Sequence, residues 1–135
     1  MIPKYQGDLT AVPISTLAYI GDAVYELGIR RLMLERRVTT SGALHNVCVK
    51  LVRATFQAKF ARVLHASLKD SEDHIFRRGR NADPGTMAKH ADPVDYRYAT
   101  ALETLFGYLY LTGQTERIKA LLDQIIQFAL AEGII

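Results

Sequence analysis

Apolar residues recur along this chain at intervals of three and four positions, the spacing of one face of an α-helix. The pattern predicts an all-α protein of five or six helices, with no convincing strand. The first long helix is predicted to start near Pro13 and to end at about Arg37. Two glycines on its apolar stripe weaken it by roughly 1 kcal/mol each relative to alanine, which predicts the close approach of another backbone. The stripe consists of Ile14, Leu17, Gly21, Val24 and Gly28.

Two further helical segments are predicted between residues 39 and 79. One begins at a cap provided by Thr39, Thr40 or Ser41 and reaches about Leu68, with room for one break. A short helix follows, with Asp70 or Ser71 as its cap and Gly79 just after its end.

A long irregular segment, GRNADPGTMAKHADPVD, covers residues 79–95 and is interrupted by prolines and a glycine. Loops of this length in a compact domain are usually functional or disordered, and its polar and basic residues favour a functional loop. Asp92 is predicted to cap the next helix, which ends at Gly113. The last helix, from about Thr115 to Glu132, has a continuous apolar stripe and is predicted to serve packing only.

Length and composition predict one globular domain over residues 1–135. The chain is 49% hydrophobic and 23% charged, and no apolar run approaches the ~18 residues that cross a bilayer. Its first residues lack the pattern of a secretory signal, so we expect a soluble cytoplasmic protein without membrane contact.

The single cysteine, Cys48, is expected to be a buried thiol. The four histidines have no cysteine partners at zinc-site spacing, which argues against structural zinc.

Charge is distributed unevenly along the chain. Residues 30–69 contain nine Lys/Arg and one acid, a net charge of +8, whereas the remaining residues sum to −5. Such a segment can neutralise phosphates while acids elsewhere do other work. The alternative is a solvated basic helix face with no ligand.

Two acids stand inside otherwise apolar helical segments. Asp22 lies in STLAYIGDAVYELGI and Glu103 in YATALETLFGYLYL, and neither has a Lys or Arg three or four positions away. Each acid could lie on a narrow polar stripe or pair with a distant arginine. Together, in a chain with a basic segment, they favour a shared Mg²⁺ or Mn²⁺ site that hydrolyses phosphodiesters. Glu26 could assist Asp22 or be an ordinary surface residue.

Three motifs, of which IFRRGRNA lies between the other two in the chain, resemble the ribonuclease III superfamily. LAYIGDAVYE is similar to its signature helix and ALETLFGYLYLTG to its later glutamate-bearing helix. IFRRGRNA, followed by a basic loop, resembles the compact subfamily called Mini-ribonuclease III. The resemblance implies that Asp22 and Glu103 are the catalytic, metal-binding acids. Full-length ribonuclease III usually has glutamates where this chain has Ser15 and Ala18, and an aspartate where it has Thr100. The absence of these acids is typical of the compact subfamily.

The resemblance also implies a mechanism. A homodimer holds double-stranded RNA in a basic valley and cuts both strands with Mg²⁺, leaving 5′-phosphates and short 3′ overhangs. The subfamily's usual substrate is the precursor of large-subunit ribosomal RNA. We predict that the RNA backbone is contacted by Arg77, Arg78, Arg80, Asn81, Lys89 and His90. Arg77 and Arg78 can also be read as a solvated helix end, where cations suit the helix dipole.

Two other functions remain open from the sequence. A non-catalytic helical RNA-binding protein would share the basic segment but would not need Asp22. A metal-dependent nucleotide phosphohydrolase fits less well, because His90 and Asp92 are not arranged as a cluster of metal ligands. Four tyrosines in apolar helical context are expected in the core or in a dimer interface: Tyr19, Tyr25, Tyr108 and Tyr110.

Overall fold

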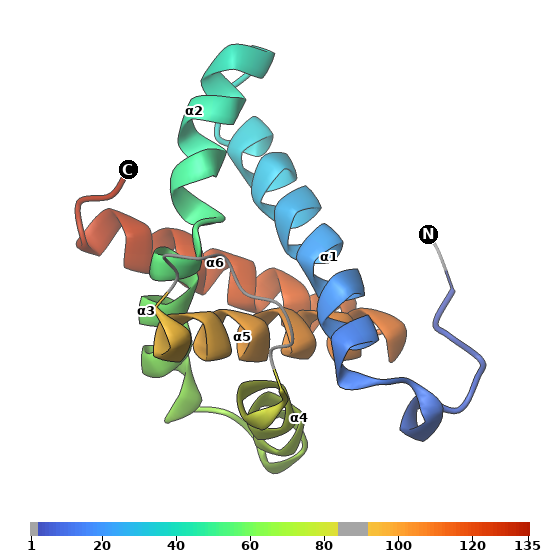
Figure 1. Cartoon of the computed structure of the whole chain (residues 1–135). Helices are drawn as coiled ribbons and strands as arrows, with labels where there is room; N and C mark the ends of the chain where they lie inside the picture. Colours follow the sequence, from blue (N-terminus) through green and yellow to red (C-terminus); the bar gives the residue numbers. More distant parts are fainter. Residues whose placement is uncertain (1–2, 84–91) are drawn as a thin grey trace.

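The computed structural model describes residues 3–83 and 92–135 (Figure 1), and over these residues it is helical without strands, as predicted. Within these two ranges, a short 3₁₀ helix precedes six α-helices. Within the described ranges, no helix combines the length and the hydropathy needed to span a bilayer. The elements are η1 (Leu9–Ala11), α1 (Ile14–Glu35), α2 (Ser41–Leu51), α3 (Ala54–His65), α4 (Asp70–Asn81), α5 (Pro93–Leu111) and α6 (Thr115–Ala131).

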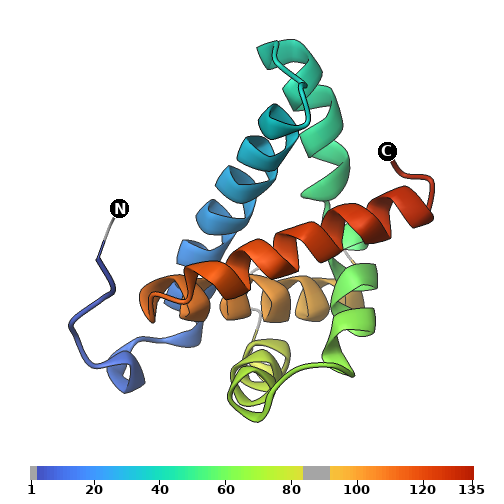
Figure 2. The same ribbon diagram turned by 180° about the vertical axis from the view of Figure 1, so that it is seen from behind.

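Helix α5 is the centre of the fold. It packs against α1, α3 and α4, and α6 crosses behind it (Figures 1 and 2). Because helices surround it, α5 is apolar over most of its circumference, as expected for a buried helix. Its largest fully buried side chains are Leu102, Leu105, Phe106 and Leu109. An acid on this helix is therefore held in a rigid setting.

Several predicted helix boundaries are confirmed. Thr40 caps α2 by accepting a hydrogen bond from the Ala43 N–H at 3.2 Å. Asp92 caps α5 by accepting from Val94 N–H at 2.8 Å. The expected break in the second helical region falls between α2 and α3, and the Cys48 thiol is buried. The stripe of α6 is buried at Leu121, Leu122, Ile125, Ile126 and Ala129.

The prediction that Gly79 follows the end of a helix was wrong. Helix α4 continues to Asn81 and begins after Lys69, so neither Asp70 nor Ser71 is its cap. Gly79 is buried against α5, where a Cβ would lie 2.6 Å from Thr104 Oγ1. The glycine therefore permits close packing of α4 on α5 and does not end the helix.

The apolar stripe of α1 also differs from the prediction. Beyond Gly21 the buried residues are Tyr25, Ile29 and Met33, at intervals of four, and the Tyr25 hydroxyl donates to Leu51 O at 2.6 Å. Gly28 faces the side chain of Leu122 and not a backbone. Gly21 does meet another backbone, and this contact builds the candidate site.

Candidate active site

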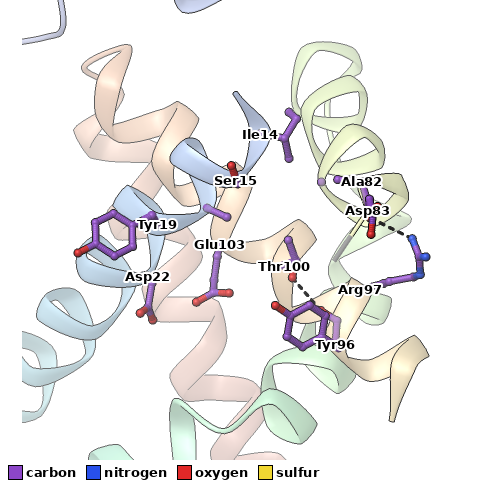
Figure 3. Close-up of a pocket in the computed structure, with 12 residues that line it drawn as sticks. Ile14, Ser15, Tyr19, Asp22, Ala82, Asp83, Tyr96, Arg97, Thr100 and Glu103 are labelled. Carbon is purple, nitrogen blue, oxygen red and sulfur yellow. Dashed lines mark hydrogen bonds between the residues drawn. The ribbon is translucent and has the colours of Figure 1, made fainter. Parts of the chain in front are cut away.

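The crossing of α1 over α5 positions the two predicted acids. A Cβ at Gly21 would overlap the Glu103 carbonyl oxygen and lie 2.7 Å from the Gly107 nitrogen. The two helices therefore touch through their backbones at this point. Asp22 follows Gly21 directly, so the crossing places its carboxyl beside that of Glu103, and Figure 3 shows the two pointing toward one another.

Both acids line one cavity of about 270 Å³ between α1, α4 and α5. Asp22 is exposed and Glu103 is mostly buried. Over residues 3–83 and 92–135, neither carboxylate forms an ion pair with a Lys or Arg. Glu26, one turn after Asp22, is instead 3.7 Å from Arg30 Nη2. The cavity thus holds two neighbouring carboxyls without a basic partner.

The electrostatics of Glu103 reflect this arrangement. Burial, the hydrogen bond with Asp22, and the negative charges of Asp22 and Glu26 raise the pKa of Glu103 to about 9. Near neutral pH a proton is therefore retained on this carboxyl. A bound cation would neutralise the same repulsion and displace that proton.

The donor set fits a magnesium ion that keeps most of its water. In the part of the chain that the structure describes, no His, Cys, Asp or Glu joins the two acids to make a group of three metal ligands. Ser15, Ala18 and Thr100 line the same cavity, so the positions where full-length ribonuclease III usually has acids surround this space. Mg²⁺ usually retains several waters and binds protein through one or two carboxylates.

The wall opposite Asp22 contains residues that sequence reasoning missed. Tyr96, Arg97 and Asp83 line the cavity (Figure 3). Arg97 Nη1 donates to the carbonyl oxygens of Arg80 at 3.3 Å and Ala82 at 3.1 Å. The carbonyl groups at the end of any helix lack partners within that helix, so the sequence predicts that these carbonyls need donors. The donor here, Arg97, comes from another helix and therefore has no local sequence signature.

A match to a known family identifies the family of this chain. The family model described as the ribonuclease III domain matches residues 15–114, a range that includes Asp22 and Glu103. The chain belongs to the ribonuclease III family.

Relatives within the ribonuclease III family are similar over almost their whole length. A protein of Symbiobacterium thermophilum named Mini-ribonuclease 3 is 42% identical over 120 residues, which cover 89% of this chain and 92% of that protein. The Mini-ribonuclease 3 of Brevibacillus brevis is 41% identical over 117 residues, 87% of this chain and 86% of the relative. These relatives confirm the resemblance to the compact subfamily.

A solved structure has the same fold. The crystal structure of a protein from Fusobacterium nucleatum superimposes with a TM-score of 0.80 at 27% sequence identity. The match covers 90% of this chain and 99% of that one. The helical architecture is therefore shared with a protein of similar length.

Four of the predicted RNA-binding residues of this ribonuclease III family member are described by the structure, and they lie beside the cavity and do not line it. Arg77, Arg78 and Asn81 are exposed on the last turns of α4, whose Gly79 lines the cavity wall. Arg77 pairs with Asp73 at 3.1 Å, and Arg80 Nε donates to Asn81 Oδ1 at 3.2 Å. Lys89 and His90 lie outside the described residues. RNA contact by this set remains a prediction.

Proposed function

We propose that this chain is an endoribonuclease that cuts both strands of double-stranded RNA. The proposal depends on one observation: in a ribonuclease III family chain, the α1–α5 crossing brings Asp22 and Glu103 together in one cavity. The names of the relatives support ribonuclease activity. Our proposed substrate is the precursor of large-subunit ribosomal RNA, and the proposed products carry 5′-phosphates and short 3′ overhangs.

Asp22 and Glu103 are proposed to hold Mg²⁺, with Mn²⁺ as a substitute. When bound, the ion would supply a coordinated water of lowered pKa and positive charge beside the scissile phosphate. Asp22 is exposed at the cavity mouth, where an RNA backbone can reach it. Glu103 lies deeper on the buried α5, where packing fixes its backbone. The pair therefore combines an accessible acid with an anchored one.

A homodimer is proposed to bring two such sites to one duplex. Helix α1, which carries Asp22, also exposes large apolar side chains on one face. They are Tyr19 (79% exposed), Leu27 (69%) and Leu34 (51%). Three large apolar side chains exposed on one helix face are typical of an interaction surface. We propose that this face packs on the same face of a second copy. A two-fold dimer suits an antiparallel duplex, whose strands are themselves related by a local two-fold axis.

The RNA would be recognised mainly by shape. A-form RNA presents phosphates and 2′-hydroxyls across its wide minor groove, which suits cations placed beside the cavity. Arg77, Arg78, Arg80 and Asn81 at the end of α4 are proposed to contact this backbone, together with Lys89 and His90.

The deciding experiment measures cleavage of labelled duplex RNA in Mg²⁺ by the unmutated protein, Asp22→Asn and Glu103→Gln. Each substitution should lower the rate by at least roughly 100-fold, because loss of a ligand should cost more than loss of a group that orients one. Glu35→Gln is the matched control, since this exposed acid of α1 pairs with Arg31 at 3.2 Å and lies outside the cavity. Chelation of the metal should stop cleavage, and single-stranded RNA should remain intact.

Undiminished cleavage by Asp22→Asn would exclude the proposed site. If the unmutated protein binds duplex RNA and does not cut it with either metal, the non-catalytic RNA-binding alternative is favoured. Hydrolysis of free nucleotides in preference to duplex RNA would instead favour the phosphohydrolase.

A further inference from the structure

A second concave surface lies at the break between α2 and α3. It is a cavity of about 280 Å³ formed by the end of α2, the first turns of α3 and the segment after α6. None of its lining residues belongs to the cavity that contains Asp22 and Glu103, which is built from α1, α4, α5 and the residues that follow α4. The lining residues are Lys50, Arg53, Thr55, Phe56, Lys59 and Ile134.

Three of these lining residues are exposed cations: Lys50, Arg53 and Lys59. No acid lines the cavity, and over residues 3–83 and 92–135 none of the three cations is within ion-pair distance of a carboxylate. Three other cations of residues 30–69 are paired, namely Arg30 with Glu26, Arg31 with Glu35 and Arg62 with Asp95. Six cations of this segment form no ion pair among the described residues, and three of these six line this one cavity.

The surrounding chain adds to the positive potential. Residues 36–69, which include all of α2 and α3, contain no Asp or Glu. Arg53 is the N-cap of the 12-residue helix α3 and makes no side-chain capping hydrogen bond. The first N–H groups of α3 therefore contribute partial positive charge beside the three cations.

We propose that Lys50, Arg53 and Lys59 bind backbone phosphates of the RNA duplex, at a contact separate from the catalytic cavity. This inference rests on the proposed function, because it takes the substrate to be duplex RNA. A polyanion fits this surface better than a single small anion does. Exposed cations are screened by salt and hold one phosphate weakly, whereas several contacts to one polyanion release several counterions together.

The test compares two triple variants that remove the same charge. One is Lys50→Gln/Arg53→Gln/Lys59→Gln, and the other is Lys4→Gln/Arg36→Gln/Lys119→Gln, which removes exposed cations elsewhere. Duplex RNA binding is measured in chelator at several salt concentrations, so that no cleavage occurs. The slope of log affinity against log salt should fall by roughly 2 to 3 in the first variant, about 0.9 for each lost phosphate contact, and should change much less in the second.

Cleavage in Mg²⁺ adds an independent measurement. The first variant should have a raised KM and an unchanged kcat at saturating RNA, because its substitutions lie outside the catalytic cavity. Helical circular dichroism checks folding. If the triple variant is unfolded, each single substitution should still lower the slope by about 0.9.

Equal slopes for the two triple variants would overturn the proposal, since general net charge would then explain binding. Inorganic phosphate, titrated against chloride at constant ionic strength, should give no saturable shift of the Thr55 and Phe56 amide signals. A saturable shift would assign the surface to small anions instead of RNA. A protein that binds duplex RNA without cutting it would refute the catalytic proposal and leave this slope comparison decisive.

Discussion

Gly21 of α1 and Gly107 of α5 each occupy the place where the other helix's backbone passes. A Cβ at Gly107 would overlap the Leu17 carbonyl oxygen and lie 3.2 Å from the Gly21 nitrogen. A Cβ at Gly21 would overlap the Glu103 carbonyl oxygen. The two glycines therefore set the distance between the helices that bear Asp22 and Glu103. The geometry of the two acids depends on this missing side-chain volume.

Gly21→Ala should separate α1 from α5. Because the obstacle is backbone and cannot rotate away, we expect a loss of about 3 kcal/mol in the free energy of unfolding. Displacement of Asp22 relative to Glu103 by about 1 Å should also lower the cleavage rate by roughly 100-fold. Urea denaturation and RNA cleavage measure the two effects.

Gly42→Ala is the control for this substitution. Gly42 is exposed in α2, and a Cβ there would have no neighbour within 4 Å. Alanine is a better helix former than glycine, so this variant should gain about 0.5 kcal/mol and keep full activity. If the two variants have the same stability, the close crossing does not constrain the fold.

The raised pKa of Glu103 predicts an unusual pH dependence of stability without metal. The unfolded chain loses this proton near the ordinary glutamate pKa of 4.5, whereas the folded protein keeps it up to about 9. The folded state therefore holds the extra proton between these values, and stability must fall as pH rises through this window. Glu103→Gln removes the titration. In chelator at pH 7.5 this variant should be more stable than the unmutated protein, on the order of 2 kcal/mol.

Thermal unfolding from pH 5 to pH 9 tests this expectation. Glu132→Gln, a substitution at an exposed acid, should leave the profile unchanged. Added Mg²⁺ should raise the Tm of the unmutated protein more than that of Glu103→Gln, because a ligand that binds the folded state stabilises it. Parallel pH profiles for the unmutated protein and Glu103→Gln would mean that Glu103 titrates normally.

The sequence carried enough information to predict the helices and to select Asp22 and Glu103. Local signals sufficed for the caps at Thr40 and Asp92, because a cap bonds its own helix within a few residues. Asp22 and Glu103 were conspicuous because each is a lone acid in an apolar segment. A site shared by the two acids was also predicted, but the backbone contact between α1 and α5 that brings them together was found only in the structure.

Features that depend on contacts between helices were not predictable from local patterns. Gly79 has the residue type of a helix terminator, yet it is buried because α5 lies against it. Arg97 reaches the end of α4 from another helix, and Arg117 reaches Glu72 across 45 positions of sequence. Such partners depend on tertiary packing. Hydrophobic periodicity and capping preferences describe single helices and therefore do not predict them.

The ion pair between Glu72 and Arg117 is expected to be important for stability. Arg117 donates from Nε to Oε2 at 2.7 Å and from Nη2 to Oε1 at 2.9 Å, and the Glu72 side chain is 2% exposed. Glu72→Gln should leave the Arg117 charge without its partner and cost about 3 kcal/mol in urea denaturation. Glu35→Gln, which breaks an exposed pair with Arg31, should cost less than about 0.5 kcal/mol.

The same pair predicts a loss of stability in acid. Burial alone would raise the pKa of Glu72, but the Arg117 hydrogen bonds and charge and the Lys69 N–H outweigh it, so the pKa is lowered. The stabilisation is therefore complete above the unfolded pKa of 4.5 and declines as pH falls below that value. Glu72→Gln should lose less stability than the unmutated protein between pH 5 and pH 3. Identical acid profiles would show that Glu72 is not stabilised as an anion.

The exposed face of α1 gives the final prediction, which concerns assembly. Leu27 is 69% exposed on the helix that carries Asp22, and Val63 is 62% exposed on a different helix, α3. If the α1 face joins two copies, Leu27→Glu should place two negative charges across a two-fold axis and shift the light-scattering mass from dimer to monomer. Val63→Glu adds the same charge and should leave the mass unchanged.

The monomer should also lose paired cuts on duplex RNA, because one site reaches only one strand. A monomeric mass for the unmutated protein at every concentration tested would exclude the dimer, and a Leu27→Glu variant that stays dimeric would place the interface elsewhere.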